Sequence, residues 1–168
     1  VLYIPMSSGL SGTCMTAMSL AQEEEYEGKV FVVDNGKISV PLHRCLLDVM
    51  NLVEAGLAAP EIKKILEDER EKMSIYIAVD TLEYLKKGGR ISKTIAFAGE
   101  LLAIKPVISV VEGEVKVIGK ARGSKNAKNL LNQMIMEKGG INFSLPFGAV
   151  YSGLSTLMLD KYIEDHRF

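Results

Sequence analysis

The segment SSGLSGT, at residues 7–13, concentrates the polar side chains that are best suited to ligand binding in this chain. It holds four hydroxyls and two glycines in seven residues, between a predicted strand at 1–5 and a predicted helix at 13–26. Ligands of α/β sheets bind beyond the carboxyl ends of strands, where free N–H groups and a helix N-terminus favour an anion. Gly9 and Gly12 allow the backbone to approach such an anion closely. The segment therefore predicts a carboxylate or phosphate site, with hydroxyl donors at Ser7, Ser8, Ser11 and Thr13.

Two other interpretations of this segment stay open. Serine, threonine and glycine also form helix caps and turns, which is the simpler explanation of a short motif. A nucleophile elbow, G-x-S-x-G, would need glycine at position 13, where the chain has Thr13. A serine hydrolase or esterase acting through Ser11 would also need a histidine in reach, and the chain has only His43 and His166.

A second polar cluster lies at 81–92, with the sequence TLEYLKKGGRIS. Gly88 and Gly89 end a predicted helix at 80–87, and Ser92 is suited to cap the next helix. Cations suit the negative end of a helix, so a solvated helix terminus is one interpretation. The other is an anion contact or a docking surface. The cations concerned are Lys86, Lys87 and Arg90.

The composition is that of a globular protein with a sizeable core, since 48% of its 168 residues are hydrophobic and 24% are charged. The net charge of -1 leaves no basic field, so we expect no nucleic-acid binding. No uncharged run reaches the roughly 18 apolar residues of a spanning helix, so we expect no stable membrane insertion. Cys14 and Cys45 lie outside any CxxC or Cys/His cluster, which predicts no metal site and a reducing cytoplasm.

The first half of the chain alternates strands and helices, as expected of an α/β layer with a parallel sheet. Apolar β-branched runs predict the strands, and apolar residues at helical spacing predict the helices. Pro41 and Pro60 suit first helical turns. The charged run at 67–72 is the predicted domain boundary. The predicted elements are a strand at 1–5, a helix at 13–26, a strand at 30–34, helices at 41–57 and 60–73, and a strand at 74–79.

The second half of the chain has a different pattern, in which helices surround a hairpin. Two apolar runs flank Glu112-Gly113-Glu114, and this arrangement predicts an antiparallel pair of strands. The predicted elements are helices at 80–87 and 92–102, strands at 106–111 and 115–120, a helix at 126–138, a strand at 147–151 and a helix at 154–163.

Four motifs follow one another along the chain: MSSGLSGT at 6–13, VVDN at 32–35, TLEYLKKGGRIS at 81–92 and LLAIKPV at 101–107. Together they resemble the DegV family of fatty-acid-binding proteins. The resemblance implies an α/β fold, with a Rossmann-like parallel-sheet domain beside a smaller α/β domain that has a mixed sheet. One long-chain fatty acid is implied to lie between them. On this basis 1–73 is part of the first domain, without its N-terminal portion, and 74–168 is part of the second, without its C-terminal portion.

The resemblance also implies roles for individual residues. Ser8 becomes the first choice for the carboxylate contact, supported by Ser7 and by the backbone amides near Gly9. Arg90 is the motif arginine, and Arg122 is implied in docking a fatty acid kinase that phosphorylates the bound acyl carboxyl. The other implied fatty-acid contacts are Ser11, Gly12 and Thr13 in the loop and Phe97, Leu101 and Ile104 along the acyl chain.

The chain departs from the family pattern in places. Cys14 stands where an aromatic residue is usual, and Asn35 where a serine is usual. The family's upstream TSQP-type loop and downstream His-Gly-Pro-Gly-type segment have no counterpart, so we expect an incomplete carboxylate site in a piece of a longer protein. We expect a bacterial cytoplasmic binding protein without cofactor or catalysis, whose partners are a fatty acid and a kinase. A non-lipid interaction domain is the remaining alternative.

Overall fold

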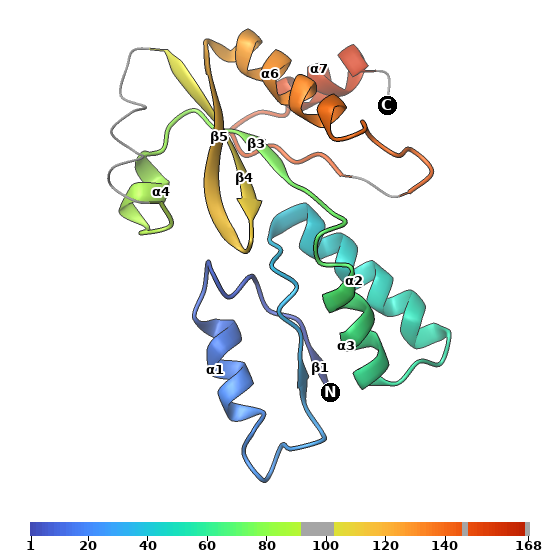
Figure 1. Ribbon diagram of the computed structural model, residues 1–168. Coiled ribbons are helices and arrows are strands. Elements are labelled where there is room, and N and C mark those ends of the chain that lie inside the picture. The colour runs from blue at the N-terminus through green and yellow to red at the C-terminus, as the bar shows by residue number, and fades with distance from the viewer. Residues whose placement is uncertain (92–102, 146–147, 167–168) are drawn as a thin grey trace.

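The computed structural model describes residues 1–91, 103–145 and 148–166. Two lobes follow one another along the chain and lie end to end (Figure 1). We call residues 1–73 the N-terminal lobe and the described residues from 74 onward the C-terminal lobe. None of the helices in the described ranges is both long and apolar enough to cross a membrane.

The N-terminal lobe is built on two short parallel strands, in which Leu2 pairs with Phe31 and Tyr3 with Val32. Helices flank this pair, with α1 on one side and α2 and α3 on the other (Figure 1). The elements are β1 (Leu2–Tyr3), α1 (Thr13–Leu20), β2 (Phe31–Val32), α2 (Ser39–Glu54) and α3 (Ala59–Asp68). The buried core residues between them are Val33, Cys45, Ile62 and Leu66. The parallel pair and its order of elements agree with the prediction for this half of the chain.

Two helices of this lobe are shorter than predicted. The pattern predicts a helix at 60–73, but α3 ends at Asp68. The other is α1. The pattern predicts a helix to residue 26, but α1 ends at Leu20 and turns follow as far as Lys29. Three consecutive glutamates at 23–25 explain the early end, because negative charge is unfavourable at the negative end of a helix.

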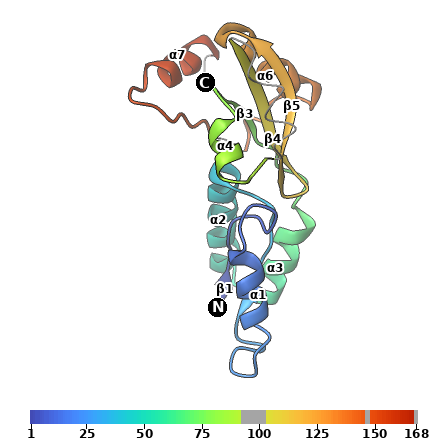
Figure 2. The same ribbon diagram turned by 90° about the vertical axis from the view of Figure 1, so that its left-hand side faces the viewer.

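The C-terminal lobe has a three-stranded antiparallel sheet in the order β3-β4-β5. Its elements are β3 (Tyr76–Ala78), α4 (Glu83–Lys87), β4 (Ile104–Val111), β5 (Glu114–Arg122), α6 (Ser124–Glu137) and α7 (Leu157–His166). The predicted third strand is thus present, but β3 joins β4 and does not extend the parallel pair. Helix α4 lies on one face of the sheet and α6 on the other (Figures 1 and 2). The core on the α4 face contains Leu82, Ile91, Ile108 and Val115.

The hairpin predicted around Glu112 and Gly113 is confirmed. Val111 pairs with Glu114, so the connection has two residues, and both have positive φ, at 53° and 80°. A two-residue turn with positive φ at both positions matches the twist of the flanking strands. Glycine takes this conformation at little cost, whereas Glu112 does so only because the hairpin requires it.

Two other predictions for this lobe have different outcomes. Residues 148–151 form no strand, and the side chains of Val150 and Tyr151 are exposed with no neighbouring strand hydrogen-bonded to them. A single extended segment without a partner does not make a stable strand. The helix predicted over 92–102 lies outside the described residues.

The two lobes meet where the hairpin tip reaches the loop after β1. The buried Ser7 hydroxyl donates to the Gly113 carbonyl at 2.7 Å. The Arg90 guanidinium donates to the Leu10 carbonyl at 3.1 Å, and the Leu10 side chain packs against the core of the C-terminal lobe. A Cβ atom on Gly9 would lie 2.6 Å from the Gly113 carbonyl oxygen. At Gly9 the backbones of the two lobes therefore approach so closely that no side chain fits.

We expect Gly9→Ala to lower the free energy of unfolding by about 1–3 kcal/mol, the usual cost of forcing an extra atom into a packed site. The measurement is equilibrium urea denaturation. Gly12→Ala is the matched control, because a Cβ there would have no neighbour within 4 Å. Equal losses in the two variants would show that the contact with Gly113 does not matter.

Candidate ligand site at the junction of the lobes

The loop after β1 is held from both sides by its first serine. Ser7 is fully buried, and its N–H donates to the Lys37 carbonyl at 3.0 Å. Its hydroxyl donates to Gly113 and also accepts the N–H of Gly9 at 3.3 Å. Ser7 is thus a structural link between the loop and the hairpin tip, and its one hydroxyl proton is used within the protein.

The second serine of the loop meets a carboxylate. The Ser8 hydroxyl donates to Asp34 Oδ2 at 2.5 Å, and its N–H donates to Oδ1 at 3.2 Å. Asp34 follows β2, the parallel neighbour of β1, and the carboxyl ends of parallel strands meet at one edge of the sheet. The Gly36 N–H completes this set with a hydrogen bond to Oδ1 at 3.3 Å. The loops after both strands are therefore joined through one side chain.

Arg70 approaches the same carboxylate from the segment after α3. Its Nη1 lies 3.6 Å from Asp34 Oδ2, the oxygen that accepts the Ser8 hydroxyl, and 3.5 Å from the Asp34 carbonyl oxygen. Burial alone would raise the pKa of Asp34. The hydrogen bonds from Ser8 and Gly36, together with the Arg70 charge, more than offset burial and lower this pKa below its ordinary value.

We call Ser7, Ser8, Asp34, Gly36, Arg70 and Gly113 the Asp34 cluster. It joins the two strand loops, the end of α3 and the hairpin tip, which are distant in the sequence. Within it, Asp34 is the anion and Arg70 the cation. The cluster lies at the junction of the lobes, at the edge of the sheet where a ligand of an α/β fold is expected.

The remaining hydroxyls of the loop pair with each other. Ser11 Oγ and Thr13 Oγ1 are 2.8 Å apart, and the Thr13 N–H donates to Ser11 Oγ at 3.3 Å. This bond uses one of the two hydroxyl protons, so the pair keeps one proton that can be donated to a ligand. None of the hydrogen-bond partners of Ser11 in the described ranges is a histidine. The geometry therefore gives no support to Ser11 as a hydrolase nucleophile.

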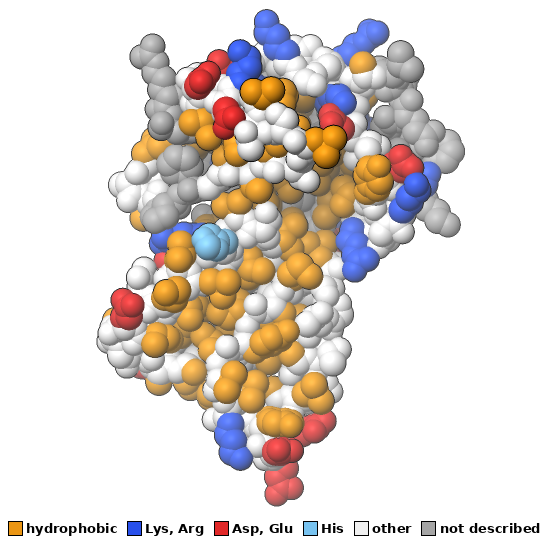
Figure 3. Space-filling model, turned by 180° about the vertical axis from the view of Figure 1, so that it is seen from behind, with side chains coloured by type: hydrophobic (Ala, Val, Ile, Leu, Met, Phe, Trp, Pro, Cys, Tyr) orange, Lys and Arg blue, Asp and Glu red, His pale blue; other side chains and the backbone are white. Residues whose placement is uncertain are grey.

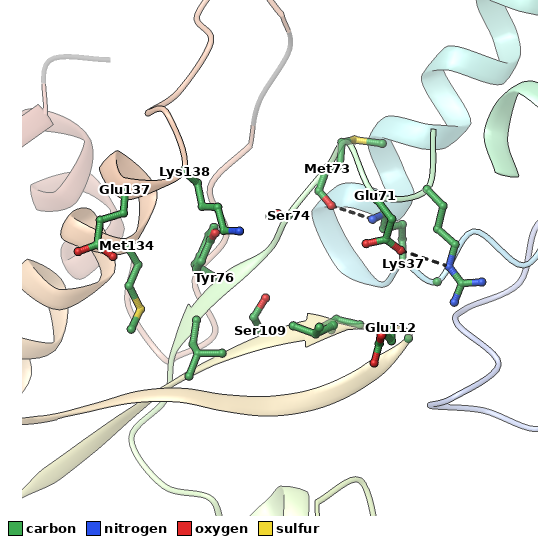
Figure 4. A pocket seen from close by; sticks show the side chains of 16 residues that line it. Lys37, Glu71, Met73, Ser74, Tyr76, Ser109, Glu112, Met134, Glu137 and Lys138 are labelled. Atoms are coloured by element: carbon green, nitrogen blue, oxygen red, sulfur yellow. Dashed lines mark hydrogen bonds and ion pairs between the residues drawn. The ribbon is translucent and has the colours of Figure 1, made fainter. Parts of the chain in front are cut away.

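A cavity of about 400 Å³ opens beside the Asp34 cluster, on the α6 side of the sheet (Figure 4). Arg70 and Gly113 form part of its wall, together with Lys37, Tyr76 and Met134. Lys37 is nearly buried, its Nζ donates to the Met73 carbonyl at 2.7 Å, and burial lowers its pKa. No residue of the loop at 7–13 lines this cavity, so it is separate from the predicted carboxylate contacts.

The other predicted site residues lie around this junction or beyond the described residues. Besides its bond to Leu10, Arg90 donates to the Gly88 carbonyl, so its guanidinium binds backbone on both sides. Ile104 begins β4 and is partly buried, while Arg122 ends β5 and is exposed. Gly12 stands in open space at the start of α1. Phe97 and Leu101 lie outside the described residues.

Sequence reasoning missed four members of the cluster as site residues. Gly36 could be recognised only as part of the turn after the predicted strand at 30–34. Asp34 could have been found, because it ends a buried strand next to the strand that precedes residues 7–13, the serine loop. Gly113 could be recognised as a turn residue, but not as the acceptor of Ser7. Arg70 lies in a charged run whose pattern is that of a solvated helix end, and nothing local distinguishes it from its neighbours.

Both cysteines lie in the interior, apart from any group of metal-binding side chains in the described ranges. Cys14 and Cys45 are buried free thiols, and burial raises the pKa of each. The Asn35 side-chain amide donates to Cys45 Sγ at 3.2 Å, so the residue that departs from the family pattern has a partner in the core. In the described part of the chain, no three His, Cys, Asp or Glu side chains are arranged to hold a metal ion.

Comparison with known proteins identifies the family of this chain. The model of the DegV family, described as uncharacterised proteins, matches residues 1–154. The chain belongs to the DegV family. A DegV domain-containing protein of Clostridium perfringens is 38% identical over 138 residues, which are 82% of this chain and 49% of that protein.

Solved structures of DegV proteins share the fold. A fatty-acid-binding DegV protein from Thermus thermophilus matches with a TM-score of 0.71 and 37% identity, over 82% of this chain and 48% of that one. A DegV protein from Eubacterium eligens, loaded with heptadecanoic acid, matches with a TM-score of 0.69 and 26% identity, over 81% and 51% of the two chains. The α/β DegV fold is thus confirmed, and the chain spans about half the length of these relatives.

The lowered pKa of Asp34 predicts how this DegV chain responds to acid. A carboxyl whose pKa is lower in the folded state stabilises the fold above its ordinary pKa, and loses that effect as the pH falls through the folded value. We expect Asp34→Asn to lower the free energy of unfolding at pH 7 by about 1.5–3 kcal/mol, the value of hydrogen bonds to a charged group. The difference from wild type should shrink as the pH falls below 3.8, the ordinary value for aspartate.

Denaturant unfolding at several pH values checks this prediction. Asp68→Asn is the control, because it removes an aspartate whose ion pair with Lys64 is exposed. That change should cost less than about 1 kcal/mol at pH 7. A difference between Asp34→Asn and wild type that stays constant down to pH 2.5 would contradict the role of the Asp34 charge.

Proposed function

We propose that the protein binds one long-chain fatty acid, with the carboxylate at the loop of residues 7–13 and the acyl chain in the C-terminal lobe. The observation that carries this proposal is the position of the loop at the junction of the lobes, in a chain 37% identical to a DegV protein solved for its fatty acid binding. We also propose that 1–73 and 74–168 are portions of two domains. The proposal places the protein in the bacterial cytoplasm.

The direction of the acyl chain follows from Leu10. Its side chain leaves the serine loop and packs against Leu82, Ile108 and Val115 on the α4 face of the sheet. Ile104 begins the strand that carries Ile108 and is partly buried. Burial of an acyl chain contributes about 0.8 kcal/mol per methylene, or about 10 kcal/mol for 16 to 18 carbons before ordering costs. An apolar path along this face would therefore dominate affinity, and the polar loop would orient the ligand.

The carboxylate contact requires an exchange of hydrogen bonds at Ser8. A hydroxyl has one proton, and the Ser8 proton is donated to Asp34 in the ligand-free protein. When Ser8 turns to a ligand carboxylate, Asp34 keeps the N–H groups of Ser8 and Gly36. The exchange replaces one charge-assisted hydrogen bond of the Ser8 hydroxyl by another, and the ligand gains a fixed orientation.

Ser8→Ala should weaken fatty-acid binding by about tenfold. Removing a donor to a buried charge costs about 1.5–3 kcal/mol. The lower end applies because the wild-type hydroxyl must break its hydrogen bond to Asp34 before it can donate to the ligand. Titration calorimetry of the delipidated full-length protein with palmitate measures the effect. Ser19→Ala is the control, because Ser19 is exposed on α1 and should leave the affinity unchanged.

The same experiment tests the function as a whole. Mass spectrometry of an organic extract should detect a fatty acid in the protein as purified. If the extract contains no fatty acid and calorimetry shows no uptake of palmitate, the proposed function is wrong and a non-lipid interaction domain becomes the better explanation. Turnover of a short-chain ester that is lost on Ser11→Ala would favour a hydrolase.

We further propose that a fatty acid kinase acts on the bound acyl carboxyl, as the family resemblance implies, and that Arg122 contributes to its docking. Arg122 is exposed at the end of β5, and the Asn126 side-chain amide donates to its backbone carbonyl at 2.9 Å. An exposed arginine at the end of a rigid strand is suited to bind an acidic partner surface.

Arg122→Ala should lower the rate of ATP-dependent acyl phosphorylation by a bacterial fatty acid kinase by about tenfold, as expected for an arginine worth about 1.4 kcal/mol in an interface. The affinity for palmitate should not change. Lys29→Ala removes an exposed cation from the other lobe and serves as the control. An equal effect of both changes would leave no specific role for Arg122.

A further inference from the structure

A fatty-acid carboxylate bound at Ser8 would lie next to the negative charge of Asp34. Asp34 Oδ2 lies 2.5 Å from the Ser8 hydroxyl, and this carboxyl is ionised at neutral pH. Two carboxylates that share one hydroxyl repel each other, and the repulsion is strong where water is excluded. A ligand carboxylate therefore binds at Ser8 only if a cation balances the pair.

The Lys63 ammonium lies at the end of β2, but it is bound by the Val32 carbonyl and by Glu67. Three further cations of the described structure lie near the loop of residues 7–13. Arg90 donates to two backbone carbonyls, those of Leu10 and Gly88. Lys37 directs its ammonium to the Met73 carbonyl, on the wall of the separate cavity (Figure 4). Of the three, only Arg70 lies beside Asp34 Oδ2, the oxygen that accepts the hydrogen bond of the Ser8 hydroxyl.

The contacts of Arg70 leave donor capacity for a second anion. Its distances to Asp34, 3.6 Å to Oδ2 and 3.5 Å to the carbonyl, are long for hydrogen bonds, and its Nε is 4.0 Å from Glu71 Oε1. Glu71 is exposed and holds the guanidinium weakly. A guanidinium has five N–H donors and binds two carboxylates at once without losing its charge.

The backbone around Arg70 is shaped to admit its guanidinium. A Cβ on Gly36 would lie 2.6 Å from Arg70 Nε, and one on Gly113 would lie 3.2 Å from Nη2. Both glycines have positive φ, at 64° and 80°. Side chains at these two positions would displace the guanidinium, so the loop after β2 and the hairpin tip together form a slot for it.

We propose that Arg70 binds the carboxylate of the fatty acid together with Asp34, and so makes the site selective for an ionised headgroup. This inference rests on the proposed function and adds the residue that balances the ligand charge. The guanidinium shortens its contacts when the second carboxylate arrives at Ser8. Arg70 is thus a headgroup-specificity residue, whereas Ser8 orients the carboxylate.

The test compares palmitate with hexadecanol, which has the same chain and no charge. Calorimetry or a competition assay measures both affinities for wild type, Arg70→Gln and Arg70→Lys. We expect Arg70→Gln to weaken palmitate binding at least about tenfold and hexadecanol binding less than about twofold. Arg70→Lys should recover part of the palmitate affinity, because it restores charge without the planar fork.

Lys64→Gln is the matched control, since it removes an exposed positive charge from α3 and should leave both affinities unchanged. Retained hexadecanol binding shows that Arg70→Gln is folded. Equal losses for acid and alcohol would overturn the proposal and make Arg70 a support of the loop only, and unchanged palmitate binding would also overturn it. If wild type binds neither ligand, the proposed function itself fails and this inference falls with it.

Discussion

The Asp34 carboxylate joins three segments of the chain that share no regular hydrogen-bonded structure at this point. It accepts the N–H and hydroxyl of Ser8 and the N–H of Gly36, and it faces Arg70 after α3. Each oxygen has two partners. A neutral, smaller side chain would leave two backbone N–H groups without an acceptor, and an unpaired buried donor is costly. The conformation of the serine loop, and hence its contact with the hairpin tip, depends on this one ionised group.

Local patterns predicted the elements well wherever the elements are stabilised locally. The β4–β5 hairpin follows from two β-branched runs around Glu112-Gly113, and α2 and α3 follow from apolar spacing with proline in their first turns. The position of Arg70 could not be predicted, because its role depends on the arrival of Asp34 and Gly113 from distant parts of the chain. The exposed segment 148–151 looks like a strand because it is apolar, yet pairing requires a neighbour, which no local pattern specifies.

Much of the apolar surface of the N-terminal lobe is not covered by its two short strands. Helix α2 exposes Leu46, Leu47, Met50 and Val53, and hydrophobic side chains extend over much of this face (Figure 3). A sheet of two strands has room for few helices, so part of an amphipathic helix remains in contact with solvent. Patches of this kind are uncommon on isolated soluble domains. The serine loop, by contrast, is tightly packed. Its backbone contact with the hairpin tip leaves no space even for a methyl group at Gly9.

The two-residue turn at Glu112-Gly113 also bears on the order in which the molecule folds. Strands joined by so short a turn pair within microseconds, whereas the parallel pairing of Leu2 with Phe31 must first close the long loop between them. We expect the hairpin to form early and the β1–β2 pair late. The Gly113 carbonyl would then already stand in place when the Ser7 hydroxyl reaches it. In this order of events the hairpin tip acts as a template, and the serine loop is the last part of the junction to take its shape.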